Sequence, residues 1–440
     1  MEHPELSELD ALRTGKSSRR TRRHLTTCAQ CQRLLEDLNQ LSAALQPTSA
    51  RSEPAFPQHP ELLGDDPEFE ARHREAVNGR RRWSREQILR AMRGWMVPYV
   101  KSRVGSGEFQ PLVAYLFSEW KCNIDCHYCW AFNNKVKGMT EDVARRSIDW
   151  LHTTPCRVLA LMGGEVLLRP KVAHKIVDYA ARKDFFVYVP TNGRLMRPDV
   201  IDRLGDAGMA TVNLAVDVVD EKPGLPKALA PIRPYFDHLV RKQYRYGYTV
   251  FLNMNINHSN LDDVRRLTEI AHDNGLATDY HICEPPLTAQ GHFRHVEDNP
   301  TFIRPDDFPK IDALLDWLID KQRQGYKMAN STQRLAEMKA FMRGKLLDWD
   351  CRAGQNTVII RTDGTLAPCF PLYSATYDWG TIERPRFEGR QLAEMKRSCQ
   401  PHCFSTLNHI VAFCYNNTRV IRWLLRQAAH GFQGVTGSLE

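Results

Sequence analysis

The fold class is decided by residues 156–193, which read CRVLALMGGEVLLRPKVAHKIVDYAARKDFFVYVPTNG. Both ends of this segment are apolar runs of strand length, and the middle has the 3.6-residue periodicity of an amphipathic helix. The segment therefore predicts a strand, a helix and a second strand. A crossover of this kind joins two parallel strands of one sheet.

The same alternation extends in both directions along the chain. Apolar runs of strand length occur at 111–120, 156–165, 185–193, 210–218, 248–256 and 277–286. Amphipathic helical segments separate these runs, so the pattern predicts an α/β fold with a parallel sheet. Six strand–helix units are too few for a full eight-fold barrel, and we therefore predict a partial (β/α)6 barrel.

The composition indicates a soluble globular protein of two or three domains. The chain has 440 residues, is 42% hydrophobic and 25% charged, and carries a net charge of +8. It has no apolar run of about 18 residues and no apolar core at its N-terminus, so we expect a cytoplasmic protein without a transmembrane segment. The basic runs at 16–23 and 79–83 are interpreted as a solvated face, and nucleic acid is not an expected partner.

Changes in composition along the chain predict its domain boundaries. A Pro-, Ser- and acid-rich stretch follows the first helical pattern, as is typical of a linker. The basic amphipathic end is read as core packing, with peripheral membrane contact as the alternative. The predicted divisions are 1–46 (N-terminal unit), 47–83 (linker), 84–110 (helical lead-in), 111–330 (barrel), 345–418 (C-terminal cysteine domain) and 419–440 (amphipathic tail).

Three cysteines follow the first predicted strand directly. Cys122, Cys126 and Cys129 form a C-x3-C-x2-C array at the carboxyl end of that strand, where β/α barrels carry their working loops. Three thiolates on a short loop suit a 4Fe–4S cluster with one iron left open for a small chelating molecule. The alternative is a structural zinc site with His127 as the fourth ligand.

This array, with Tyr128 inside it and MGGE after the second strand, resembles the radical S-adenosylmethionine (SAM) enzymes. The resemblance covers about residues 110–285 and implies that SAM chelates the open iron. It also implies reductive cleavage of SAM to a 5′-deoxyadenosyl radical. Two positions depart from the family pattern, since Val166 replaces the usual proline and Ala215 a common serine. The implied SAM-binding residues are Gly163, Gly164, Glu165, Asn192 and Asp217, with Asn255 and Asn260 as weaker candidates.

A second cysteine group lies in the C-terminal part of the chain. Cys351, Gly364 and Cys369 form a C-x12-G-x4-C pattern, whose RTDGTLAPC segment predicts a hairpin with an Asp-Gly turn. The pattern resembles the SPASM/twitch extension of radical SAM enzymes and implies one auxiliary 4Fe–4S cluster, with zinc as the alternative. The implied ligands are Cys351, Cys369, Cys399 and Cys403, with Cys414 as a possible replacement.

Two cysteines stand alone and are interpreted as core residues, Cys156 and Cys283. Cys283 ends the sixth strand and is also a weak candidate for a catalytic hydrogen donor.

The N-terminal unit contains an H-x3-C-x2-C array. His24, Cys28 and Cys31, together with the upstream His3, supply the two histidines and two cysteines of a tetrahedral zinc site. The pattern resembles the zinc-binding anti-sigma-factor fold, which implies a helical docking or regulatory module with a protein partner. The alternative is a surface histidine with two free thiols.

These features together predict an enzyme, a radical SAM oxidoreductase or transferase. We expect it to abstract hydrogen from an unactivated C–H bond of a peptide or small natural product, with a reductant such as flavodoxin or ferredoxin. The alternatives are a lipid substrate, a zinc and iron–sulfur redox regulator of the anti-sigma type without catalysis, and an RNA-modifying enzyme. No cobalamin-binding domain is visible in the sequence.

Overall fold

A computed structural model describes residues 23–24, 26, 28, 32, 109–129, 135–282, 299, 301–345, 349–370, 378–387 and 389–416. The linker, most of the helical lead-in and the tail therefore lie outside the described residues. So do His3, Cys31 and Cys283. Of the predicted zinc ligands, His24 and Cys28 are described, and the Cys28 amide donates to the His24 carbonyl at 3.0 Å, as in a helical turn.

The centre of the molecule is a sheet of eight strands in the order β6-β5-β4-β3-β2-β1-β7-β8. The strands β1 to β6 pair in parallel, each with its neighbour in sequence, which confirms the predicted partial barrel. Their bounds are β1 Val113–Glu119, β2 Val158–Gly163, β3 Phe186–Thr191, β4 Met209–Ala215, β5 Thr249–Ile256 and β6 Ala277–Ile282.

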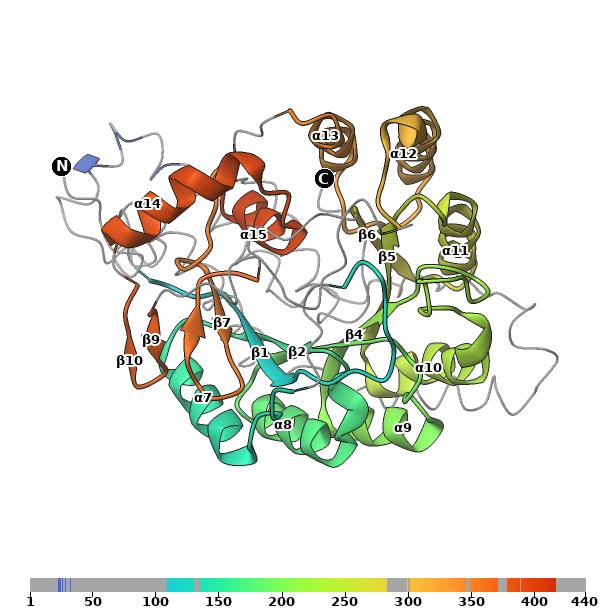
Figure 1. The fold of residues 1–440 in the computed structure, drawn as a ribbon. Coiled ribbons are helices and arrows are strands. Elements are labelled where there is room, and N and C mark those ends of the chain that lie inside the picture. Colours follow the sequence, from blue (N-terminus) through green and yellow to red (C-terminus); the bar gives the residue numbers. More distant parts are fainter. Residues whose placement is uncertain are drawn as a thin grey trace.

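Helices line the outer side of the curved sheet (Figure 1). Buried side chains from the strands, such as Leu252, Met254 and Tyr280, share one apolar cluster with Val264 and Leu267 of the neighbouring helix. Burying this face supplies the main favourable free energy of the fold. The helices are α7 Glu141–Thr153, α8 Pro170–Arg182, α9 Pro198–Ala207, α10 Arg233–Tyr246, α11 Leu261–Asp273, α12 Phe308–Arg323 and α13 Thr332–Met342.

Local sequence explains where these helices begin and end. The Thr140 side chain accepts from the Val143 amide, and so caps the start of α7. Pro198 opens α9, where a missing amide costs nothing, and Gly208 ends it in the left-handed conformation at φ 96°.

The C-terminal cysteine segment begins with a hairpin that joins the barrel sheet. Strand β7 (Thr357–Ile360) pairs in parallel with β1, and β8 (Leu366–Ala367) turns back antiparallel through Gly364 at φ 87°. The predicted Asp-Gly hairpin is thus confirmed. Although it belongs to the predicted C-terminal cysteine domain, its strands extend the barrel sheet. The remaining elements are β9 Gly380–Thr381, β10 Arg384–Pro385, α14 Gly389–Cys399 and α15 Thr406–Asn416.

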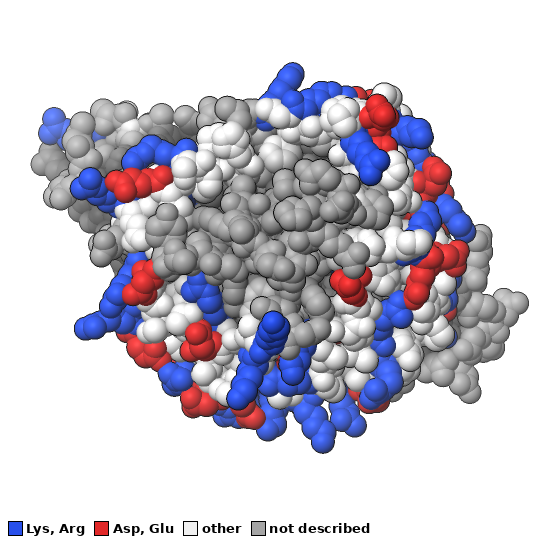
Figure 2. Space-filling model, viewed as in Figure 1, with Lys and Arg blue, Asp and Glu red and all other residues white. Residues whose placement is uncertain are grey.

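Two surface observations complete the fold. On the face drawn in Figure 2, Lys and Arg are interspersed with Asp and Glu among the described residues, a pattern typical of a solvated face. Within the described ranges, no helix is long and apolar enough to cross a membrane.

Candidate active site

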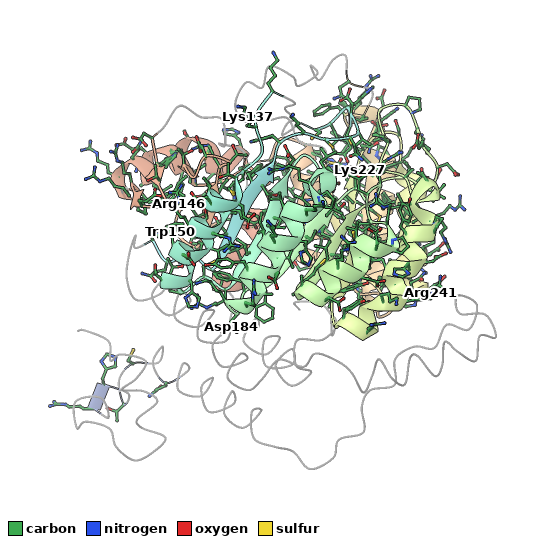
Figure 3. All side chains as sticks on the ribbon, turned by 90° about the horizontal axis from the view of Figure 1, so that it is seen from below. Lys137, Arg146, Trp150, Asp184, Lys227 and Arg241 are labelled. Carbon is green, nitrogen blue, oxygen red and sulfur yellow. The ribbon has the colours of Figure 1, made fainter. Side chains whose placement is uncertain are left out.

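The predicted site residues gather at the carboxyl ends of the barrel strands. In Figure 3, Lys137 and Lys227, from loops that follow β1 and β4, lie at one end of the barrel, and Asp184, just before β3, lies at the other. The loop that carries Cys122, Cys126 and Cys129 follows β1 and is therefore at the end marked by Lys137. Parallel strands bring residues distant in sequence to this one edge.

The cysteine loop is held by backbone contacts to a second loop. The His127 amide donates to the Gly224 carbonyl at 3.1 Å, and the Cys129 amide donates to the Cys126 carbonyl at 3.1 Å. Cys126 is buried, while Cys122 and Cys129 are partly exposed. The loop is therefore held in place by contacts within the chain, and two of its three cysteines are only partly buried.

Gly163 and Gly164 allow β2 to pass close to the start of this loop. A Cβ atom on Gly163 would lie 1.5 Å from the Glu119 carbonyl oxygen, and one on Gly164 would lie 2.4 Å from the Lys121 carbonyl oxygen. The Gly164 amide donates to that Glu119 oxygen at 2.9 Å. The glycine pair is thus required by the approach of two backbones, a reason additional to the expected approach of SAM.

Glu165 ties the ends of β2 and β3 together. Its carboxylate is fully buried and accepts from the Thr191 hydroxyl at 2.9 Å and the Asn192 amide at 2.8 Å. Burial raises the pKa of Glu165, although these donors act in the opposite direction. The Asn192 side chain in turn donates to the Asn123 side chain in the cysteine loop at 2.8 Å.

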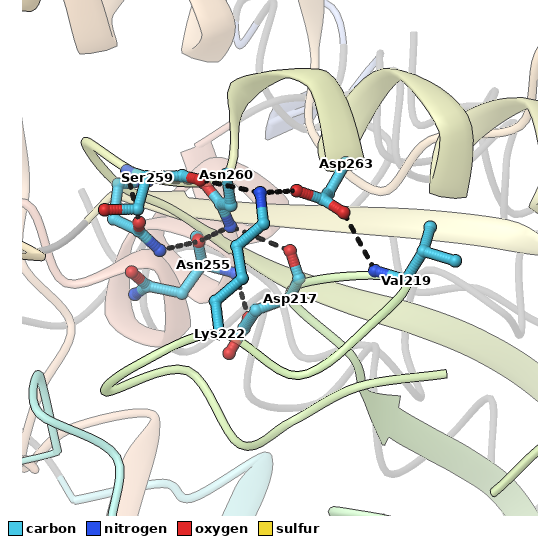
Figure 4. A network of polar contacts seen from close by, with 8 residues as sticks. Asp217, Val219, Lys222, Asn255, Ser259, Asn260 and Asp263 are labelled. Carbon is cyan, nitrogen blue, oxygen red and sulfur yellow. Dashed lines mark hydrogen bonds and ion pairs between the residues drawn. The ribbon is translucent and has the colours of Figure 1, made fainter. Parts of the chain in front are cut away.

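Asp217 connects the cysteine loop to β4 and β5. The Tyr128 hydroxyl donates to one of its carboxylate oxygens, and the Asn255 amide donates to the other at 2.8 Å. Burial raises the pKa of Asp217, which is 1% exposed. The Asn260 side chain donates to the carbonyl oxygens of Asp217 and Asn255 (Figure 4). Asn260, a weaker candidate for SAM binding, therefore joins the backbone that follows β4 to that of β5.

The sequence analysis did not identify Lys227. Its ammonium group lies 5.1 Å from the Tyr128 ring centroid, and its carbonyl accepts from the Asp217 amide at 2.8 Å. Burial lowers the pKa of Lys227, but Cys126, Asp217 and the other two thiols of the loop outweigh burial and raise it. A single lysine in an aperiodic loop gives no signal in the sequence.

The donor set fits a cluster held by thiolates. Burial raises the pKa of Cys122 and Cys126, so these thiols need a metal or a nearby cation to ionise. Lys227 supplies such a charge, and the Asn255 Oδ1 atom is buried without a hydrogen-bond partner among the described residues. Within the same part of the chain, no three His, Cys, Asp or Glu side chains surround a single metal position.

The four predicted auxiliary ligands come from segments that the fold brings together. The Gly354 amide donates to the Pro368 carbonyl at 3.1 Å, and the Cys351 amide donates to the Gln400 side chain at 3.4 Å. These bonds join the segments that carry Cys351, Cys369, Cys399 and Cys403. Burial raises the pKa of Cys351, and that of Cys399 to about 11.

Two further cysteines, Cys156 and Cys414, can be compared with the roles predicted for them. Cys156 is fully buried, its thiol donates to the Leu112 carbonyl at 3.2 Å, and burial raises its pKa to about 12, which confirms a core residue. The side chain of Cys414 lies outside the described residues, although its backbone belongs to α15.

Comparisons with known proteins identify the central part of the chain. The Radical SAM superfamily profile matches residues 121–283. The AdoMet-dependent heme synthase of Methanosarcina barkeri is 26% identical over 211 residues, which are 46% of this chain and 56% of that protein. AlbA of Bacillus subtilis, named for biosynthesis of the antilisterial bacteriocin subtilosin, is 22% identical over 64% of this chain and 60% of its own. The chain thus spans about half the length of the curated relatives it matches.

Solved structures share the fold at low identity. The structure titled native anSMEcpe with bound AdoMet has a TM-score of 0.51 and 16% identity, over 73% of this chain and 100% of its own. Streptococcus suis SuiB bound to precursor peptide SuiA has a TM-score of 0.52 and 12% identity, over 89% and 84%. These structures share the partial-barrel fold with this chain, whose residues 121–283 match the Radical SAM superfamily profile, and relatives named as synthases support an enzyme.

Proposed function

We propose that the protein is a radical SAM enzyme that abstracts hydrogen from an unactivated C–H bond of a peptide or small natural product. The observation that carries this proposal is the convergence of the three-cysteine loop, Glu165, Asp217 and Lys227 at the carboxyl end of the barrel. The profile match over 121–283 supports the same reading. The cleavage of SAM would yield the 5′-deoxyadenosyl radical that attacks the substrate.

Each residue of the site would have a distinct part in holding the cofactors. Cys122, Cys126 and Cys129 would hold a 4Fe–4S cluster, which supplies one electron and an open iron for SAM. Lys227 would balance the negative charge of the three thiolates. The residues that would contact SAM are Gly163, Gly164, Glu165, Asn192, Asp217 and Asn255.

The C-terminal cysteines would hold one auxiliary 4Fe–4S cluster. Cys351, Cys369, Cys399 and Cys403 have the donor chemistry for it, and the fold joins their segments. Its role would be electron transfer to or from the substrate, with flavodoxin or ferredoxin as the external reductant. In the N-terminal unit, His3, His24, Cys28 and Cys31 would bind zinc and dock a protein partner.

The names of the relatives support a peptide substrate first. AlbA is named for a bacteriocin, and the SuiB structure contains a precursor peptide. The name of the heme synthase supports a small metabolite as the second candidate substrate.

Anaerobic reconstitution tests the proposed function. Dithionite and SAM should yield 5′-deoxyadenosine, and Cys126→Ala should abolish it because the cluster loses a ligand. The matched control is Cys156→Ala, which removes a buried thiol outside the site and should leave both the product and the iron content in place. About eight irons and one zinc per chain would agree with all three sites. Full iron loading of the wild type without deoxyadenosine would refute the proposal and favour a regulator.

A further inference from the structure

The inner face of the barrel sheet has an apolar half and a polar half. On the first two strands and β7, inward side chains such as Phe117, Ala160 and Ile359 form one apolar cluster. On β3 to β6 several inward positions carry polar side chains, alongside apolar ones such as Phe251. We call five of these polar residues the inner polar patch: Tyr188, Asn213, Asn253, Asp279 and His281.

Strand alternation shows that the patch faces away from the helices. Tyr280 points toward α11, where its hydroxyl lies 2.7 Å from the Thr268 hydroxyl in the outer apolar layer. Successive side chains of a strand point to opposite faces, so Asp279 and His281 point to the inner side. Asn253 lies directly opposite Asp279 in the pairing of β5 with β6.

Asp279 has too few hydrogen-bond donors. It is 6% exposed, and its Oδ1 atom has no hydrogen-bond partner in the part of the chain that the structure describes. Its Oδ2 atom lies 3.2 Å from His281 Nε2, and the Asn253 side-chain nitrogen lies 2.8 Å from the same His281 atom. One ring nitrogen either accepts from Asn253 or donates to Asp279. The carboxylate therefore has at most one donor among the described residues, at Oδ2, and none at Oδ1.

A buried carboxylate in this state destabilises the fold. Leaving a charged acceptor without donors in a buried place costs free energy that a partner would recover. Asp263 shows the usual arrangement at a similar exposure of 7%, since it accepts from the Val219 amide at 3.0 Å and pairs with Lys222. The contrast indicates that Asp279 is arranged for a group that arrives from outside.

The patch adjoins the proposed SAM site. Asn255 lies two residues beyond Asn253 on β5, its amide is bonded to Asp217, and it lies opposite His281 in the strand pairing. A molecule bound at Asp279 would therefore lie two residues deeper along the strands than Asn255, one of the residues proposed to contact SAM. Hydrogen abstraction requires such closeness between the bound substrate and the radical source.

We propose that the inner polar patch binds the substrate through a cationic hydrogen-bond donor, an ammonium or guanidinium group, that pairs with Asp279. This inference rests on the proposed function, because it takes the barrel interior as the place where the substrate binds. A cation suits the site better than a neutral amide, since hydrogen bonds between charged partners are about twice as strong. The group could be a lysine or arginine side chain or a free amino terminus.

The first test measures stability without any ligand. Asp279→Asn removes a negative charge that has too few hydrogen-bond donors. The melting temperature of the reconstituted full chain should therefore equal that of the wild type or exceed it. Asp263→Asn, the matched control, breaks a paired carboxylate and should lower the melting temperature by several degrees. If Asp279→Asn lowers it as much as Asp263→Asn, the carboxylate is structural and the proposal is wrong.

The second test measures binding of three small probes by saturation-transfer NMR on the reconstituted full chain. The probes are Nα-acetyl-lysine amide, norleucine amide and Nα-acetyl-glutamine amide. Binding of the first assigns the group to a side chain, and binding of the second assigns it to an amino terminus. Either should be weakened about tenfold by Asp279→Asn. The proposal is overturned if neither cation binds, if the glutamine amide binds as well as both, or if the substitution changes nothing.

A parallel measurement separates this proposal from the proposed function. Deoxyadenosine formation by the wild type without substrate tests SAM cleavage alone. If it is absent while a cationic probe still binds through Asp279, the proposed function fails and the cation site stands. If it is present while the cations do not bind, only the inference about Asp279 is lost.

Discussion

Lys227 places a positive charge beside three thiols, and burial would otherwise keep two of them, Cys122 and Cys126, neutral. Lys227→Met should lower the reduction potential of the cluster on Cys122, Cys126 and Cys129, because the reduced cluster loses a stabilising cation. Redox titration followed by electron paramagnetic resonance would measure this shift. Lys227→Arg keeps the charge and should restore most of the potential, whereas an unchanged potential in Lys227→Met would show that the charge has no such part.

Gly164, like Gly163, is a residue where two backbones approach too closely for a side chain. Gly164→Ala should destabilise the protein by about 2–4 kcal/mol, since the new Cβ would meet the Lys121 carbonyl at 2.4 Å. Gly389 is the matched control, because a Cβ there meets nothing within 4 Å. Gly389→Ala should be neutral or slightly stabilising. Urea unfolding measures both, and equal effects would contradict the argument from close approach.

At the scale of elements, helices α13 and α15 are joined by a titratable pair. The His409 side chain lies 3.4 Å from Glu337, and burial lowers the pKa of His409 although Glu337 opposes this. Glu337 is held at a pKa of about 2, because hydrogen bonds from His409 and Gln333 outweigh its burial. The pair thus has pKa values that differ between the folded and the unfolded chain, which makes stability depend on pH.

The sign of this dependence follows from the lowered pKa of His409. The folded state binds this proton more weakly than the unfolded chain, so stability is full above about pH 6.5 and falls as the pH drops below it. His409→Gln should flatten the decline in unfolding free energy between about pH 6.5 and 5. The control is His402→Gln, since His402 is exposed. An identical pH profile for wild type and His409→Gln would contradict the prediction.

At the scale of the molecule, the auxiliary segment and the barrel share one sheet. Because β7 pairs with β1, the C-terminal cysteine segment and the barrel should unfold together. The double variant Cys351→Ala and Cys369→Ala should lose about four irons and lower the melting temperature of the whole protein in a single transition. Scanning calorimetry with iron analysis measures both. A separate early transition with an unchanged barrel would show that the two parts are independent.

The order of the elements could be predicted because it depends on local patterns. Apolar runs and amphipathic stretches identified all six barrel strands, and bounds shifted by a few residues where loops begin, as at the end of β4. The cysteine loop and the glycine pair could be predicted from spacing within a short segment. The joining of β7 to the barrel could not, because pairing between residues 113–116 and 357–360 depends on contacts far apart in sequence.

The sequence by itself determined the strand and helix order, the position of the cysteines at the ends of strands, and the matched domain at 121–283. Periodicity and spacing involve residues close together in the chain, so they can be recognised in the sequence alone. Only the tertiary structure decided that Lys227 lies beside three thiols, that Tyr128 is bonded to Asp217, and that Asp279 Oδ1 has no donor among the described residues. These facts depend on sheet register and on loops that meet across the barrel, where each side chain's burial and partners are settled by distant parts of the chain.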